Sequence, residues 1–329
     1  MVGPYRRRPP DGPEPQGPPS RLWRRPARDL GYLPPRRPPR RRSAAGTVVG
    51  VLGGVAGLCA VAIVGYSLAG PKRPAPGTGA PGEFPRPGSR QAAFAGPLYR
   101  SGALDPVGCE LSKIREHDED SMRVFLDRLA DCLDEAWRRQ FAKAALPSFT
   151  APHRVFWSVS GSSPCGSYPA PGAAAFYCPA NDTLYVGLDD IVETAGGEPV
   201  SHYGVYARVI AHEYGHHVQE DAGILEYGHG LMTAAAAAAA SHEVSRRIEL
   251  QAQCLAGAFL SAQRDSIPMT SEQYDAVLDD ARARGDEDEP ADERDHGSGT
   301  HYADWVARGY TQRVLSACNT WTAAPSDVW

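Results

Sequence analysis

The stretch "VIAHEYGHHVQ", residues 209–219, places three histidines and one glutamate within six consecutive positions. An α-helix turns about 100° per residue, so His212 and His216 would lie about 40° apart on one face. Two imidazoles on one helix face can bind the same metal ion, and this spacing is typical of zinc. Glu213 would flank the ion at about 100° from His212, where it can act as a base on water rather than as a ligand. His217 lies about 140° away and is expected either to pack or to support a ligand from outside the metal's coordination sphere.

The sequence around this motif predicts a small α+β domain. Residues 203–223 have a helical pattern that ends at Gly223. The segment "AFYCPANDTLYVGL", residues 175–188, is rich in aromatic and β-branched residues around a turn-forming "PAND", which is typical of a hairpin. Residues 120–141 and 243–263 repeat apolar side chains at helical spacing. We therefore expect helices packed on a small, mostly antiparallel sheet.

A catalytic zinc site needs a third protein ligand and one open position. Two common arrangements fail here: Ala222 stands where one of them requires histidine, and the glutamate that another requires, about twenty residues after His216, would fall in an alanine run. Glu249 is the strongest candidate, because it lies inside a well-defined predicted helix that can hold a ligand rigidly. Glu220 is too close to the histidines on their own helix, and His229 lies in a Gly-rich stretch that we expect to be a loop. The remaining candidates are Asp221, Glu226, His242 and Glu243.

The beginning of the chain differs in composition from the rest. The first 42 residues hold 12 Arg and only three acidic residues, and they are rich in proline. Such a segment cannot bury enough apolar surface to fold, so we expect residues 1–43 to be disordered. An Arg-rich run can contact nucleic acid. However, residues 44–70 follow without one charged residue, and about 20 apolar residues suffice for a transmembrane helix. We therefore relate the basic run to membrane topology and expect no nucleic-acid partner.

The charge asymmetry around residues 44–70 predicts an orientation. Basic residues are enriched on the cytoplasmic side of membrane spans, so residues 1–43 would be cytoplasmic and the chain after residue 70 extracellular. A cleavable signal peptide fits less well, because its apolar core is typically about 7–15 residues long. Residues 71–104 are rich in proline and glycine and are expected to form a semi-extended linker. The sequence thus predicts a single-pass protein of the cell membrane, with the lipid bilayer contacted through residues 44–70.

Six cysteines follow the apolar segment, and an even number outside the cytosol favours disulfides. The sequence contains no C-x-x-C pair, which argues against a cysteine zinc cluster. The order along the chain suggests three pairings, of which the second brackets a Gly/Pro-rich loop and is the best supported: Cys109–Cys132, Cys165–Cys178 and Cys254–Cys318.

Four segments carry a resemblance to a known family: "AFYCPANDTLYV", "VIAHEYGHHVQ", "RRIELQAQCLAGAF" and "DHGSGTHYADWVARGY". Together they resemble the neutral zinc metallopeptidases of bacteria. The resemblance covers roughly residues 105–320, and the order and spacing of the four segments make it much more specific than the histidine motif alone.

The resemblance implies a zincin-like fold for residues 105–322 and a membrane-anchored or exported endopeptidase that uses Zn²⁺ on peptide or protein substrates. It matches Glu249 to the third zinc ligand. It also matches His296 to a histidine that would steady the oxyanion, although a structural histidine fits that position equally well. The family pattern has aspartate where this chain has Gln253, whose side chain we expect to hydrogen-bond a ligand histidine. Because glutamine carries no charge, a catalytically silent binding or scaffold protein is the alternative function.

Overall fold

The computed structural model describes residues 87–169, 174–194, 197–290 and 293–329. The predicted tail and apolar segment before residue 71 lie outside these ranges, and none of the helices that the structure describes is long and apolar enough to span a bilayer. The elements in chain order are α2 (Arg90–Ala95), η1 (Pro97–Arg100), α3 (Glu119–Lys143), β1 (His153–Trp157), β2 (Gly161–Ser163), β3 (Gly166–Tyr168), β4 (Ala175–Cys178), β5 (Thr183–Gly187), α4 (Asp190–Thr194), α5 (Tyr203–Asp221), α6 (Ile224–Ala234), α7 (Ala238–Ala262), α8 (Ser271–Arg282), α9 (Gly299–Gln312), η2 (Leu315–Cys318), η3 (Thr320–Thr322) and η4 (Pro325–Asp327).

A three-stranded sheet with the order β1-β5-β4 contains the predicted hairpin. Strands β4 and β5 are antiparallel, with Cys178 opposite Thr183, so the turn falls at residues 179–182 as expected. Strand β1 runs parallel to β5, a pairing across a long connection that no local pattern specifies. Strands β2 and β3 form a separate antiparallel pair. The predicted α+β class with a small, mostly antiparallel sheet is confirmed.

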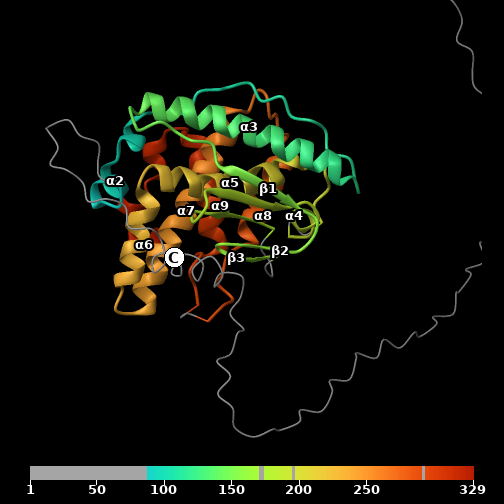
Figure 1. The fold of residues 1–329 in the computed structure, drawn as a ribbon. Coiled ribbons are helices and arrows are strands. Elements are labelled where there is room, and N and C mark those ends of the chain that lie inside the picture. The colour runs from blue at the N-terminus through green and yellow to red at the C-terminus, as the bar shows by residue number, and fades with distance from the viewer. Residues whose placement is uncertain (1–86, 170–173, 195–196, 291–292) are drawn as a thin grey trace, which may run out of the picture. The chain divides into compact units, whose positions relative to one another are not determined.

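Helix α5 lies at the centre of the fold (Figure 1) and is buried on almost every side. It contacts α3, α7, α8 and strand β4. A Cβ atom on Gly215 would lie only 3.1 Å from the Cα atom of Ala252 on α7, so these two small residues let the helices cross closely. The helix ends as predicted before Gly223, whose φ of 71° is a conformation that favours glycine.

All three predicted disulfides are present in the folded region. Their Cα–Cα distances are ordinary for disulfides, at 5.5, 5.7 and 5.3 Å for Cys109–Cys132, Cys165–Cys178 and Cys254–Cys318.

The folded region extends further at both ends than the sequence indicated. Residues 87–104, assigned to the linker, contain α2 and η1, and Leu98 and Tyr99 are buried in the main core. The Pro/Gly-rich composition of residues 71–104 conceals this short apolar stretch, so the linker prediction is wrong for its last part. At the other end Val328 is fully buried.

Candidate metal centre

Helices α5 and α7 bring two histidines and one carboxylate together. The Nε2 atoms of His212 and His216 are 3.3 Å apart. The Oε2 atom of Glu249 lies 3.2 Å from Nε2 of His212 and 3.6 Å from Nε2 of His216. The three residues form a group that can hold a metal ion. None of the other residues considered as a third ligand belongs to this group, within the part of the chain that the structure describes.

The spacing of the three donor atoms fits zinc. Zinc bonds to imidazole nitrogen and carboxylate oxygen are about 2.0–2.2 Å long, so two tetrahedral ligand atoms lie about 3.3–3.5 Å apart. The observed separations of 3.2, 3.3 and 3.6 Å bracket this value. Two imidazoles and one carboxylate are also a ligand set of catalytic zinc sites, which leave a fourth position open.

Burial and mutual attraction shift the pKa values of all three side chains of the cluster. Burial lowers the pKa of His212 to about 4. Burial acts in the same direction on His216, but the Glu249 carboxylate raises the pKa of His216 to about 9. Burial alone would raise the pKa of Glu249, but His216 and His212 hold it well below its ordinary value. The Glu249 carboxylate therefore stays ionised and favours a positive charge between the three side chains.

Glu213 lies beside the cluster and touches the sheet. Its Oε2 atom accepts a hydrogen bond of 3.1 Å from the backbone N–H of Tyr177 on β4. Burial raises the pKa of Glu213 to about 7, and His216 lowers it in part. A divalent cation held next to this carboxyl would lower its pKa further. Glu213 thus flanks the cluster without belonging to it, as the helical geometry predicted.

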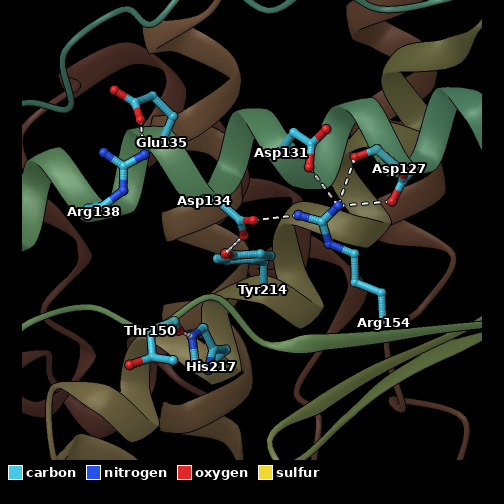
Figure 2. Close-up of polar contacts among 9 residues, drawn as sticks. All are labelled: Asp127, Asp131, Asp134, Glu135, Arg138, Thr150, Arg154, Tyr214 and His217. Atoms are coloured by element: carbon cyan, nitrogen blue, oxygen red, sulfur yellow. Dashed lines mark hydrogen bonds and ion pairs between the residues drawn. The ribbon is translucent and has the colours of Figure 1, made fainter.

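His217 does not belong to the cluster, and Figure 2 shows its ring directed at Thr150. Its Nε2 atom lies 2.7 Å from the carbonyl oxygen of Thr150. Its Nδ1 atom lies 3.0 Å from Oδ1 of Asp182 and 3.2 Å from the hydroxyl of Tyr177. The predicted packing role is therefore confirmed, and His217 connects α5 to the hairpin that carries Tyr177.

Helix α3 fixes the position of α5 relative to β1. Figure 2 shows Asp134 between Tyr214 of α5 and Arg154 of β1, and both donate hydrogen bonds to its carboxylate. The same guanidinium lies 2.9 Å from Asp127 and 2.8 Å from Asp131. Three carboxylates of one helix thus hold a single arginine of the sheet.

Gln253 does not hydrogen-bond either histidine of the cluster in the region that the structure describes, contrary to the prediction. Its Oε1 atom accepts a 2.9 Å hydrogen bond from Arg208, which also pairs with Asp280 on α8. Arg208 precedes His212 by one helical turn on the same face and is almost fully buried, so its guanidinium takes the acceptor that the histidine would have used. The Nδ1 atom of His212 has no hydrogen-bond partner among the residues described.

His296 lies beside a tyrosine that contacts the cluster. Its Nδ1 atom is 2.7 Å from Asp295, and its backbone N–H donates a 2.7 Å hydrogen bond to Asp286. Its ring centroid is 6.2 Å from that of Tyr302, whose hydroxyl donates a 3.3 Å hydrogen bond to Glu249.

His229 lies in a helix rather than in the expected loop. Helix α6 continues through its two glycines because tertiary packing supports it: Gly228 approaches Ile248 and Trp321 closely.

Sequence reasoning missed Gln219 and Tyr302. The Oε1 atom of Gln219 lies 3.0 Å from Nδ1 of His216. The available signal was the spacing, since residues three apart are neighbours on a helix surface. No comparable signal was available for Tyr302, because only the fold brings α9 against Glu249.

Comparisons with known proteins agree with this geometry. The family model described as "Putative neutral zinc metallopeptidase" matches residues 108–321. The chain is similar to the uncharacterized protein YpfJ of Escherichia coli K12, with 29% identity over 62% of this chain and 72% of that protein. It is also similar to the uncharacterized protein Rv2575 of Mycobacterium tuberculosis H37Rv, with 32% identity over 58% of this chain and 68% of that protein.

No solved structure matches the chain. The family model covers well over half of the sequence and includes the whole metal cluster, and membership implies zinc as the cofactor. The chain belongs to the neutral zinc metallopeptidase family.

Proposed function

We propose that the protein is a membrane-anchored zinc endopeptidase in which His212, His216 and Glu249 hold the metal. The observation that carries this proposal is the near-tetrahedral spacing of their donor atoms next to a carboxylate that is not needed as a ligand. A zinc ion in this place supplies a Lewis acid, which polarises a carbonyl and lowers the pKa of a bound water to about 7. Glu213 accepts the proton of the attacking water and passes it to the leaving amine. His296 steadies the oxyanion of the same carbonyl.

Strand β4 supplies an edge for the substrate backbone. It is the last strand of its sheet. In an antiparallel pair, backbone groups point alternately toward and away from the partner strand. The N–H of Tyr177 points away from β5, since it donates to Glu213, and the backbone of Ala175 shares this direction. An extended peptide that pairs with this edge would present its carbonyl beside the metal cluster.

The proposal includes an anchor at residues 44–70 and a cell-surface location. Its support is the uncharged apolar segment and the excess of arginine before it. Protease added to intact cells should digest the folded domain while a tag at residue 1 stays protected. The reverse pattern would contradict the orientation.

The test of the chemistry uses the full chain purified in detergent. Glu213→Gln should keep zinc but lose hydrolysis of a denatured protein, because it removes the base and no ligand. His212→Ala should lose both zinc and hydrolysis, and a chelator should abolish wild-type activity. Full activity of Glu213→Gln would contradict the mechanism. A wild-type protein that holds zinc without any hydrolysis would favour the catalytically silent alternative.

A further inference from the structure

Two buried glutamines form a row of hydrogen bonds that begins at His216 on α5 and ends at Cys318 near the carboxyl terminus. Gln219 and Gln251, called here the amide relay, are 0% and 1% exposed. The Nε2 atom of Gln219 donates to the carbonyl of Ile248 and to Oε1 of Gln251, both at 2.9 Å. The Nε2 atom of Gln251 donates to the hydroxyl of Tyr99 at 2.8 Å and to the carbonyl of Cys318 at 3.0 Å. Both protons of each amide are therefore used.

Backbone carbonyls set the direction of the relay. A carbonyl oxygen only accepts hydrogen bonds, so the nitrogen end of Gln251 must face Cys318 and the nitrogen end of Gln219 must face Ile248. A flipped Gln219 would put its oxygen against the Ile248 carbonyl and would lose both of its donated bonds. The Oε1 atom of Gln219 must therefore face Nδ1 of His216, which lies 3.0 Å away.

The fixed direction determines the state of the His216 ring. Opposite an acceptor, Nδ1 must carry a proton, and a neutral imidazole with a proton on Nδ1 keeps a lone pair on Nε2. It is this Nε2 atom that lies among the donor atoms of His212 and Glu249. Because Nδ1 of His212 has no such partner among the residues described, only one of the two histidines is oriented in this way.

We propose that Gln219, held in direction by Gln251, is a positioning residue that fixes the ring orientation and tautomer of His216 for zinc binding. This inference rests on the proposed zinc site. Residues in this role are usually carboxylates, backbone carbonyls or waters. An amide performs it without adding a second negative charge beside the Glu249 carboxylate.

The experiment measures zinc affinity of the full-length protein by competition with a chromophoric chelator. Gln219→Met keeps the length of the side chain but removes both the acceptor and the donors, and it should weaken zinc binding by about 10–100-fold. Gln251→Met should weaken it less, because Gln219 keeps its bond to Ile248. The matched control is Gln140→Met, which removes an equally buried glutamine. Gln140 donates a hydrogen bond to Ser101, which is not part of the cluster or the amide relay. This control variant should leave zinc affinity unchanged.

A second readout does not depend on zinc. Nitrogen–proton correlation spectra of the metal-free protein are recorded above the raised pKa of His216, about 9, so that the ring is neutral. They should show the ring proton on Nδ1 of His216, and Gln219→Met should shift it toward Nε2 while Gln140→Met keeps it on Nδ1. A Gln219→Met protein that folds like the Gln140→Met control and binds zinc as tightly as wild type would overturn the inference. So would an absent Nδ1 proton in wild type, whether or not zinc binds. A wild-type protein that shows the proton but binds no zinc would instead refute the proposed function.

Discussion

At the residue scale, the least expected feature is the way Arg208 is held. The side chain is 1% exposed, and its partners are an uncharged amide, Gln253, and a carboxylate, Asp280. Burial alone would raise the pKa of Asp280, but Arg208 and Arg284 bring it below its ordinary value of 3.8. Aspartate at position 253 would place a second carboxylate on the same guanidinium. Glutamine at this position therefore provides an acceptor for Arg208, and its presence is not in itself a sign of lost activity.

Asp280→Asn should lower stability by about 3–5 kcal/mol at neutral pH, because it leaves a buried arginine without its countercharge. A folded-state pKa below the unfolded value means that the carboxylate stabilises the protein above pH 3.8. This contribution is lost as the pH falls through the lower folded pKa. Urea unfolding at several pH values should therefore show the gap between wild type and variant closing in acid. Asp265→Asn, at a side chain 91% exposed, is the control and should change little. A gap that is independent of pH would contradict this account.

At the scale of elements, the site depends on how closely α5 and α7 cross. Helical periodicity is a local signal, so the sequence predicted both helices, and it placed His212 and His216 on one face. The crossing itself is not local: it follows from Gly215 meeting Ala252, and neither residue indicates its partner. For the same reason the sequence did not reveal Gln219 bonded to Gln251, 32 positions away.

Gly215→Ala should therefore weaken zinc binding and destabilise the fold by about 1–3 kcal/mol, the usual cost of overpacking. The added methyl group would lie 3.1–3.3 Å from three atoms of Ala252, so the helices must separate and Glu249 must move from the histidines. Chelator competition and thermal unfolding measure the two effects. Gly230→Ala is the matched control, since its Cβ would meet nothing within 4 Å in an exposed turn of α6. This variant should be neutral or stabilised by about 0.5–1 kcal/mol. Equal effects of both substitutions would show that the crossing is not critical.

At the scale of the whole molecule, the folded unit is larger than the family match. The match covers residues 108–321, but Tyr99 before it accepts from Gln251, and Val328 after it is fully buried. Order along the chain was enough to predict the disulfides. It gave no indication that one of them, Cys254–Cys318, lies at the far end of the amide relay, since Gln251 and Cys318 are 67 positions apart.

Replacing both Cys254 and Cys318 by serine should have two consequences. A loop of 64 residues would lose its closure, which the chain-entropy model values at about 4 kcal/mol. The Cys318 carbonyl would also no longer be held in place to direct Gln251, so zinc affinity should fall, although less than in Gln219→Met. The control is the double serine variant of Cys165 and Cys178, which opens a loop of 13 residues worth about 3 kcal/mol and has no bond to the relay.

Chemical unfolding and chelator competition on the two double variants separate stability from metal binding. Both should unfold more easily, with the larger loss in the Cys254 and Cys318 variant, and only that variant should bind zinc more weakly. The comparison is made at a temperature where both proteins are folded, because an unfolded fraction would lower the apparent affinity of either. If zinc affinity falls equally in both, the loss reflects general destabilisation and the disulfide has no specific connection to the site. If it falls in neither, the Cys318 carbonyl keeps its place through the hydrogen bonds of η2 alone, and the relay ends there without the disulfide.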